Sequence, residues 1–570
     1  MNYKLTNLDE VKALYDPINE LSFDTETCGL YGKIRLAQFF QPNWEEVLLV
    51  EWPNPANLAL LLSQCNIAMH NAHYDLTVVQ EQFMHEWLPK EFEDTFLLAR
   101  LALPGLESYS FDDVLHHVVG FDPYVQANLA KKELQKSKWD TKVLTEDQLI
   151  YAALDVYYMP DVLNAVRCAV DSPSYQLDKL TLRHALVIQW HGMPICQDRI
   201  NSKYSENQQV IAEAAVPINV NSWQQVRQYL NCTESDDEAL ARMSANGDEK
   251  AAKVRLVRKL KKQLSFLDKF QGERIYGKFK PSARSGRLTS DDQNLQQLPR
   301  ALKGVFSAPP GRVLAYADYA QLELRTVCAI TACRRMEALF RAGEDLHTYT
   351  SDFLFGKSED PAKADYNRQV SKGCNFLLLY GGGIPMFISV MLKQMNIFMK
   401  ESEAMVARKK WRNLWTEIFA WQQQGLSKWQ LGKLGSTPLG RQYKAVLLTD
   451  FLNIENQGAG AEVAKLALHY FMRDCFAKYP GLLVCNFIHD SFILECDDDQ
   501  EVYQAVSKDL AKCMQLAWFE MSKCFKVKDI PMPVEVKVGY NWGDIESKKI
   551  EKVYEYKLDG LVYLGEANAL

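Results

Sequence analysis

Two acidic stretches in the second half of the sequence have the residue types that phosphate chemistry needs. The apolar run at residues 313–317 predicts a buried strand that ends at Asp318. Two further apolar runs, within residues 482–495, flank His489-Asp490-Ser491 and predict a hairpin with an acid at its tip. Carboxylates held rigidly at strand ends are good ligands for divalent cations. If Asp318 and Asp490 meet, they can hold two metal ions that clamp the attacking and leaving oxygens of a phosphoryl transfer.

Between these acids, a predicted helix has a cationic and aromatic stripe. Arg368, Lys372, Phe376 and Tyr380 recur every four residues, so they share one slowly drifting face of the helix. Two cations followed by two rings suit a nucleotide laid along the helix, with the charges at the triphosphate and the rings at the sugar and base. The glycines at 381–383 would end the helix and permit a hinge.

A second set of acids lies in the first third of the chain. Asp24 and Glu26 fall on the same side of a short predicted strand. Asp75 lies in the first turn of a later helix, and Tyr151 and Asp155 lie one turn apart on a helix predicted over residues 146–165. Any one of these acids alone is more often structural. Together they match what phosphodiester hydrolysis requires, namely clustered acids to hold cations and a group that positions water.

Five ordered blocks resemble the conserved blocks of family A DNA polymerases, the DNA polymerase I type. DYAQLELR (318–325), RQVSKGCNFLLLYG (368–381) and IHDS (488–491) are similar to the family's A, B and C motifs. SGRLTSDDQNLQQLP (285–299) and NIENQGAGAEVAK (453–465) resemble two more blocks. The resemblance implies a template-directed polymerase that extends a primer with dNTPs, using two Mg²⁺ ions for which Mn²⁺ can substitute.

The same resemblance implies roles for individual residues. Asp318, Asp490 and the carbonyl of Tyr319 would bind the metals, and Lys372 would protonate the departing pyrophosphate. Glu323 would crowd the ribose 2′ position and so select deoxynucleotides, whereas single-subunit RNA polymerases have a small residue there. The implied nucleotide-binding set is Arg368, Lys372, Phe376, Tyr380, Glu323, Gln321 and His347, and the implied DNA-binding set is Arg287, Asn294, Gln296, Asn453, Gln457 and His489.

The N-terminal acids resemble the three motifs of DEDD proofreading exonucleases, in the variant with a tyrosine. The patterns DxE, NxxxD and YxxxD are all present, and SKWDTKVLTEDQLIYAALDV (137–156) is similar to the last block of that family. The resemblance implies an RNase H-like fold and a 3′→5′ exonuclease. Asp24, Glu26 and Asp155 would ligate two metals, Asp75 would support the second, and Tyr151 would orient the attacking water.

These assignments predict a multidomain chain of α/β and α+β class. The Ser172-Pro173-Ser174 patch marks the boundary between an exonuclease domain and a right-hand polymerase domain. The final stretch, with VYEYKL and LVYL, is expected to form a small hairpin. The predicted divisions are exonuclease 1–172 and polymerase 173–570, the latter with thumb about 180–285, palm about 286–340 and 445–545, fingers about 341–444 and a C-terminal extension 546–570.

Composition and cysteine content agree with a cytoplasmic enzyme. They do not indicate which molecules the protein binds, which is inferred from the motifs. The 570 residues carry a net charge of −7, yet a basic run at residues 250–287 predicts contacts with DNA phosphates. No apolar run approaches the length of a membrane helix, and the thirteen cysteines lack metal-like spacing. We expect a monomer that binds primer-template DNA, in the compact layout common among phage enzymes.

Three departures from the family pattern keep alternatives open. Ser491 stands where the C motif usually has glutamate, Gln293 where the family usually has proline, and Leu377 where a glycine is common. The main alternative is a 3′→5′ exonuclease whose polymerase half holds DNA without synthesising it. The presence of Asp318 and Asp490 argues against it. A second alternative is a non-catalytic DNA-binding module, against which the exonuclease acids argue. A third is an RNA polymerase, against which Glu323 and the exonuclease domain argue.

Overall fold

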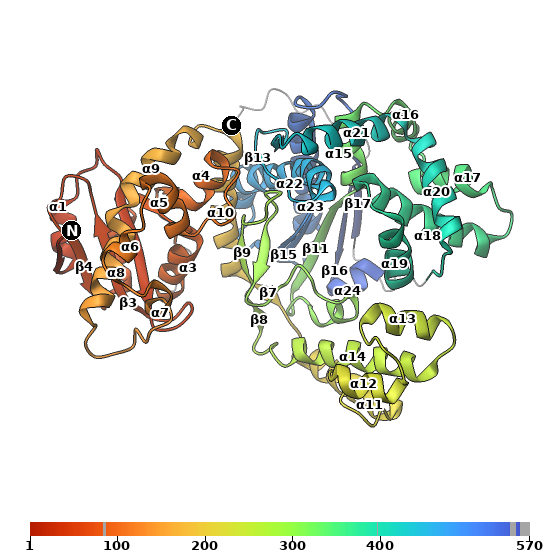
Figure 1. The fold of residues 1–570 in the computed structure, drawn as a ribbon, viewed down its shortest axis with the longest axis horizontal. Coiled ribbons are helices and arrows are strands. Elements are labelled where there is room, and N and C mark those ends of the chain that lie inside the picture. The colour runs from red at the N-terminus through yellow and green to blue at the C-terminus, as the bar shows by residue number, and fades with distance from the viewer. Residues whose placement is uncertain (84–86, 396, 548–553, 559–570) are drawn as a thin grey trace.

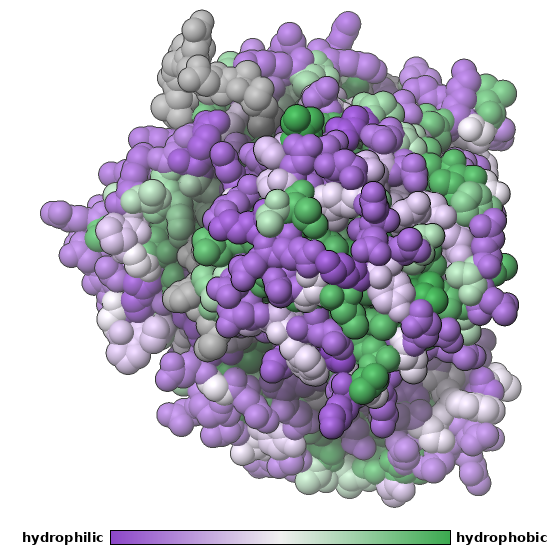
Figure 2. Space-filling view, turned by 90° about the vertical axis from the view of Figure 1, so that its left-hand side faces the viewer, coloured by the Kyte–Doolittle hydropathy of each residue, from purple (hydrophilic) through white to green (hydrophobic). Residues whose placement is uncertain are grey.

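The protein has two parts, each built on its own sheet and core. The computed structural model describes residues 1–83, 87–395, 397–547 and 554–558. The part that begins at the N-terminus, called here the N-terminal domain, lies to one side of the larger C-terminal body (Figure 1). Hydrophilic side chains cover most of the face that the N-terminal domain turns outward (Figure 2). Within the described ranges, no helix is both long and apolar enough to cross a membrane. All thirteen cysteines are free thiols.

A six-stranded mixed sheet forms the centre of the N-terminal domain. Its order is β1-β4-β3-β2-β5-β6, in which β2, β3 and β4 are the antiparallel meander and β5 and β6 continue in parallel. The strands are buried on both faces: Leu36 and Phe40 pack with α8 (Glu146–Tyr157), and Ala37 and Phe39 pack with α3 (Ala72–Phe83). The strands are β1 (Tyr3–Leu5), β2 (Leu21–Thr27), β3 (Ile34–Phe40), β4 (Val47–Glu51), β5 (Asn66–Met69) and β6 (Glu91–Asp94).

The single helix predicted over residues 146–165 is wrong, because the structure has two helices there. Helix α8 begins at a capping box formed by Thr145 and Gln148 and ends at Tyr157, and α9 (Met159–Val166) follows after one residue. Pro160, in the first turn of α9, has no amide hydrogen and crowds the preceding turn, so it cannot continue α8. The break falls beyond Asp155 and leaves that residue on α8.

Helix α10 (Pro173–His191) joins the two parts and belongs to both. Its N-cap is Ser172, whose side chain accepts a hydrogen bond from the Tyr175 amide. The Ser172-Pro173-Ser174 patch, expected to mark the domain boundary, therefore lies at the start of this helix. Tyr175 packs in the N-terminal core, whereas Ile188 packs in the C-terminal core. Asp178, also on α10, is buried and forms ion pairs with Arg441 and with Lys465, the latter at 2.6 Å. The helix therefore fastens one part to the other.

The C-terminal body is built on a five-stranded antiparallel sheet in the order β14-β15-β11-β16-β17. Two long helices, α22 (Leu448–Asp474) and α23 (Gln500–Ser522), pack against one another, and α23 packs on the sheet. Strand β17, which contains most of the VYEYKL segment, pairs antiparallel with β16. The LVYL segment, its expected partner in a hairpin, lies outside the described residues. The strands are β11 (Arg312–Tyr319), β14 (Leu483–Ile488), β15 (Ser491–Asp497), β16 (Val534–Gly539) and β17 (Tyr554–Leu558).

Two groups of helices flank this sheet (Figure 1). The first has a small core of its own, which includes Val226, Leu240 and Val254. The second surrounds the cationic helix α18. The first group is α11 (Gln197–Ala214), α12 (Trp223–Leu230), α13 (Asp237–Ala245) and α14 (Glu249–Leu267); the second is α15 (Leu322–Thr331), α16 (Arg334–Ala342), α17 (Leu346–Phe355), α18 (Pro361–Leu377), α19 (Ile384–Met395), α20 (Glu401–Leu414) and α21 (Thr416–Gln430).

Candidate active sites

Asp318 and Asp490 meet at the end of the C-terminal sheet. Strand β11 carries Asp318 next to its end, and its register partner on β15 is Ser491, the residue after Asp490. His489 has a φ of 57°, which allows the tight turn between β14 and β15. Burial, and then repulsion from Asp490, raises the pKa of Asp318 to about 8. The strand register therefore places the two acids at the same end of the sheet, and the charge of Asp490 acts on the Asp318 carboxyl.

The raised pKa predicts how stability of the metal-free protein depends on pH. Because the pKa of Asp318 is higher in the folded than in the unfolded state, its stabilising contribution is complete in acid and is lost as the pH rises toward about 8. In EDTA, we expect the free energy of unfolding to fall between pH 6 and 8 more steeply for the wild type than for Asp318→Asn. The difference in slope should approach about 1.4 kcal/mol per pH unit. Denaturant unfolding at each pH measures it, and equal slopes would contradict the assignment.

The predicted cationic stripe is present on α18. Val370 and Cys374 are buried and anchor the helix, while Lys372 and Phe376 are exposed. Arg368 forms an ion pair with Asp345 at 2.8 Å. Burial alone would raise the pKa of Asp345, but bonds from Arg368 and Thr348 hold it at about 2. Helix α18 ends at Leu377 and a 3₁₀ turn carries the chain to Gly381, whose φ is 75°.

Glu323 is the meeting point of four segments beside Asp490. One carboxylate oxygen pairs with Arg287 at 2.5 Å, and the other accepts a hydrogen bond from the Tyr380 hydroxyl at 2.9 Å. The Asn456 amide donates to the Tyr380 hydroxyl and to the Glu323 carbonyl, each at 2.9 Å. After burial, Glu323 is the main cause that raises the pKa of Asp490 to about 6. Asn456 was missed by the motif analysis, although it lies between Asn453 and Gln457.

Two of the predicted DNA-binding residues also shape the backbone. The Asn294 side chain accepts hydrogen bonds from the amides of Gln296 and Gln297, each at 3.1 Å. The Gln296 side chain donates to the Phe487 carbonyl on β14 at 2.9 Å. Gln293 has a φ of 85°, which proline cannot adopt, so this turn differs from one with the family's usual residue.

The other predicted contact residues lie just before α15, on α17 and α22, and in the β14–β15 turn. Gln321 precedes α15 with a φ of 59°. Asn453 and Gln457 are half-buried on α22, and burial followed by Arg287 lowers the pKa of His489. His347 is buried on α17, where its Nδ1 lies 3.1 Å from the Asn375 amide nitrogen. Burial lowers the pKa of His347 to about 4, so it is neutral at neutral pH and brings no positive charge to the site.

The N-terminal acids form a second cluster. Ligand oxygens of Asp24 and Glu26 on β2 and of Asp155 on α8 lie within 4.8 Å of one another. Asp75, in the first turn of α3, accepts a hydrogen bond from Thr25 at 2.7 Å. Burial, and then mutual repulsion, raises the pKa values of Asp24 and Glu26 well above their ordinary range. Three clustered carboxylates that repel one another fit a hard divalent cation, which would neutralise them.

Residues outside every motif complete the cluster. The Tyr124 hydroxyl donates to Asp155, and Lys131 Nζ lies 3.9 Å from Asp155 Oδ1. Tyr151 is buried, with its ring 5.9 Å from that of Tyr124. Tyr124 and Lys131 come from short helices, α6 (Pro123–Gln126) and α7 (Lys131–Leu134), that pack against α8 and direct these two side chains to Asp155. No local spacing could have identified them.

Missed residues also surround Asp318. Glu535 on β16 is its cross-strand partner, so both side chains lie on one face of the sheet. Buried Lys537 forms an ion pair with Glu535, and its charge lowers the pKa of Asp318 against the larger effects of burial and Asp490. The charge of Lys537 therefore acts on Asp318, although Glu535 already pairs with that lysine.

The C-terminal sheet brings two acids together at one end of its strands, near Glu323, which bonds to Tyr380 just after the cationic helix α18. The N-terminal sheet holds a cluster of three carboxylates. Together these features define a nucleic-acid polymerase joined to a nuclease. The profile of DNA polymerase family A matches residues 193–544, and that of a 3′-5′ exonuclease domain matches residues 2–169. The chain belongs to DNA polymerase family A and carries a 3′-5′ exonuclease domain. The predicted RNase H-like and right-hand polymerase folds are confirmed.

Named relatives agree with this assignment. DNA polymerase I of Aquifex aeolicus is 27% identical over 92% of this chain and 95% of that protein. The thermostable DNA polymerase I of Thermus filiformis is 29% identical over 48% of this chain but only 33% of its own length. A DNA polymerase of Bacillus phage SP01 is 25% identical over 50% of this chain and 33% of its own length. The fold matches the POL domain of Pol1 from M. smegmatis, in complex with DNA primer-template and dNTP, with a TM-score of 0.74 at 18% identity, over 94% of this chain and 97% of that one.

Proposed function

We propose that the C-terminal body extends a DNA primer by adding dNTPs opposite a template, and that the N-terminal domain removes mispaired 3′ ends. The observation that carries the proposal is that Asp318 and Asp490 lie together at one end of the sheet, close to Glu323, which accepts a hydrogen bond from Tyr380 just after the cationic helix α18. Two Mg²⁺ ions, or Mn²⁺, held by Asp318, Asp490 and the Tyr319 carbonyl would activate the primer hydroxyl and hold the triphosphate.

The chain's own groups orient and neutralise the nucleotide. Arg368 and exposed Lys372 face the triphosphate, and Lys372 supplies the proton that pyrophosphate takes as it leaves. Phe376 packs on the sugar, and Tyr380 lies where the templating base arrives. Arg287, with Asn294, Gln296, Asn453, Gln457 and His489, contacts the primer-template.

In the N-terminal domain, Asp24, Glu26 and Asp155, with Asp75, would hold the divalent cations that activate water. Tyr151 orients the attacking water, while Tyr124 and Lys131 fix the Asp155 carboxylate.

The proposed divisions follow the helix groups. Helices α11 to α14 form most of the thumb, α17 to α21 form most of the fingers, and the five-stranded sheet with α22 and α23 forms most of the palm. The protein acts as a monomer in the cytoplasm, where its DNA and dNTPs are found. A gel assay of a labelled primed template tests the proposal: with dNTPs the primer should lengthen, and without them it should shorten. A primer that only shortens would support the alternative of a nuclease with a non-synthesising half.

Glu323 is proposed to select the sugar. Replacing Glu323 with alanine should reduce the preference for dNTPs over rNTPs by roughly 10²-fold, because the side chain would no longer fill the space beside the 2′ carbon. Single-nucleotide incorporation kinetics with each substrate measure the ratio of kcat/KM values. Glu323→Gln keeps the size and loses the charge, so it should keep the preference. If Glu323→Ala keeps it too, this residue does not select the sugar.

A further inference from the structure

A glutamine in the N-terminal sheet lies directly opposite one of the clustered acids. Gln38 on β3 is the register partner of Asp24 on β2. Because the two strands are antiparallel, the side chains of opposite residues lie on the same face of the sheet, with Cβ atoms about 4.5–5.5 Å apart. Leu36 and Phe40, two residues to either side of Gln38, pack with α8. Gln38 therefore lies on the face that is covered by α8, the helix that carries Asp155.

The amide of Gln38 is buried without a partner. The residue is fully buried, and neither its Oε1 nor its Nε2 makes a hydrogen bond. Among the buried amide side chains that the structure describes, Gln38 alone has both polar atoms unpartnered. A buried polar group without a hydrogen bond is destabilising, whereas an apolar side chain of the same size is not. Stability of the fold therefore does not account for a glutamine at this position.

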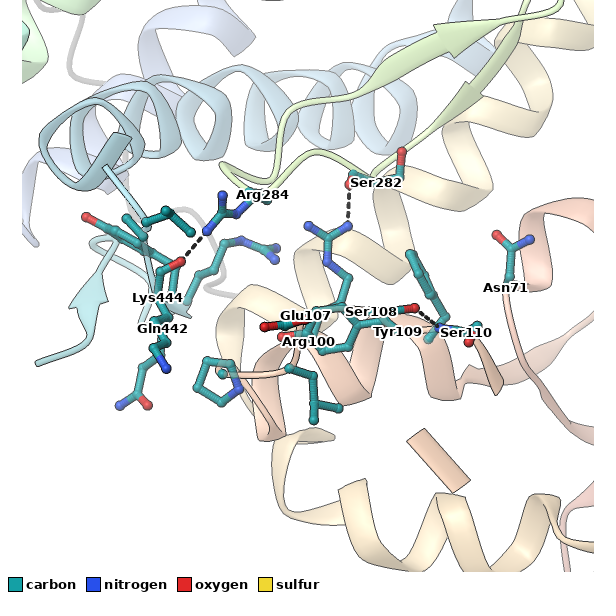
Figure 3. A pocket seen from close by; sticks show the side chains of 18 of the residues that line it. Asn71, Arg100, Glu107, Ser108, Tyr109, Ser110, Ser282, Arg284, Gln442 and Lys444 are labelled. Carbon is teal, nitrogen blue, oxygen red and sulfur yellow. Dashed lines mark hydrogen bonds between the residues drawn. The ribbon is translucent and has the colours of Figure 1, made fainter. Parts of the chain in front are cut away.

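Other buried or interfacial polar groups of the chain have found acceptors. Gln41, just after β3, is also fully buried, and its amide nitrogen donates to the carbonyls of Asp16 and Asn19 at 2.9 and 2.8 Å. At the cavity of about 960 Å³ between the two parts of the protein, Arg100 donates to the Ser282 carbonyl (Figure 3). The unpartnered amide in β3 is an exception that calls for a reason of its own.

Asp24 lacks a hydrogen bond as well. Within the described parts of the chain no donor bonds its carboxylate, whereas Asp155 accepts a hydrogen bond from Tyr124. Asp24 and Gln38 are thus an acceptor and a donor on neighbouring strands, each without a partner. Carboxylates that bind a metal are usually oriented by hydrogen bonds from surrounding groups. The Gln38 amide is placed to supply such a bond to Asp24.

We propose that Gln38 is a positioning residue of the N-terminal acid cluster. Its amide donates a hydrogen bond to the Asp24 carboxylate when that carboxylate binds a divalent cation, and so fixes its orientation. This inference rests on the proposed function, and it adds to that function a residue that acts on the cations only through Asp24.

Binding of Mn²⁺ without DNA tests this role directly. The titrations use the full chain with Asp318→Ala/Asp490→Ala, so that the C-terminal pair holds no cation, and isothermal titration calorimetry measures the affinity. Gln38→Met keeps the length of the side chain and removes the amide. It should weaken Mn²⁺ binding about tenfold, since loss of a group that bonds a metal ligand costs on the order of 10–100-fold. Binding as tight as in the parent chain would overturn the proposal.

Thermal unfolding separates positioning from a structural role. In EDTA, Gln38→Met should raise the melting temperature of the full chain by about 2–4 °C, because an unpartnered buried amide is removed. The matched control is Gln41→Met, which removes a buried amide that is bonded. It should lower the melting temperature and leave the Mn²⁺ affinity unchanged. A lowered melting temperature in Gln38→Met, or an equal loss of Mn²⁺ affinity in both variants, would show that Gln38 acts through folding and would overturn the proposal.

Hydrolysis of a single strand shows whether the same bond matters during catalysis. In Gln38→Met, the Mg²⁺ concentration that gives half of the maximal degradation rate should rise about tenfold, while primer extension is unchanged. An unchanged Mg²⁺ dependence of degradation would contradict the inference.

Asp24→Ala distinguishes failure of this inference from failure of the proposed function. If Asp24→Ala binds Mn²⁺ as tightly as the parent chain, the acid cluster is not the cation site, and the function proposed for the N-terminal domain fails. If Asp24→Ala loses Mn²⁺ binding and Gln38→Met does not, the inference about Gln38 alone is wrong.

Discussion

Asp490→Ala should reduce primer extension by at least on the order of 10³-fold while degradation of single strands continues at the wild-type rate. The side chain supplies half of the acidic pair that lies at the end of β11, and charge stabilisation of this kind is among the largest contributions to catalysis. Rapid-quench incorporation of one dNTP measures the loss. Because the Asp490 carboxyl is buried and repels its neighbours, its removal should not lower the melting temperature in EDTA.

Asp365→Ala is the matched control for this experiment. It removes an exposed carboxylate from α18, the helix that carries Lys372, and should leave extension unchanged. Extension by Asp490→Ala within about tenfold of the wild type would show that the C-terminal acids do not perform the chemistry.

Asp24→Ala should abolish 3′→5′ degradation, again by on the order of 10³-fold, and leave primer extension intact. Asp24 is one of three residues whose carboxylate oxygens lie within 4.8 Å of one another, so the substitution removes one of the three carboxylates that would hold the cations. Release of nucleotides from a labelled single strand measures the effect. The control is Asp147→Ala, which removes an exposed acid from α8, the helix of Asp155. Undiminished degradation by Asp24→Ala would place the nuclease activity elsewhere.

Both acid sites were predictable from sequence because their residues lie in short segments with strong local patterns. An apolar run that ends in Asp318, and a pair of runs around Asp490, predict strand ends without any knowledge of their neighbours. The four-residue spacing also predicted α18 correctly for Arg368, Lys372 and Phe376. Tyr380 lies beyond the end of α18, on a 3₁₀ segment.

Residues that depend on packing between distant segments could not be predicted. Tyr124 and Lys131 reach Asp155 through short helices with no periodic pattern, and Lys537 reaches Asp318 through strand pairing. The pairing of β17 with β16 is also non-local, so the alternation in VYEYKL could indicate a strand but not its partner. The break between α8 and α9 differs from these cases, since Pro160 was a visible local signal.

Helix α10 has a consequence for the energetics of proofreading. Because it lies in both cores and its buried Asp178 is bonded to Arg441 and Lys465, the distance from one catalytic centre to the other is built into the scaffold. The DNA, not the protein, must then move between the two centres. Moving it requires unstacking of terminal base pairs, which costs about 1.4 kcal/mol per step for matched DNA. A mispaired terminus has already lost part of that stacking, so the choice between keeping and discarding a nucleotide is made largely by the duplex itself.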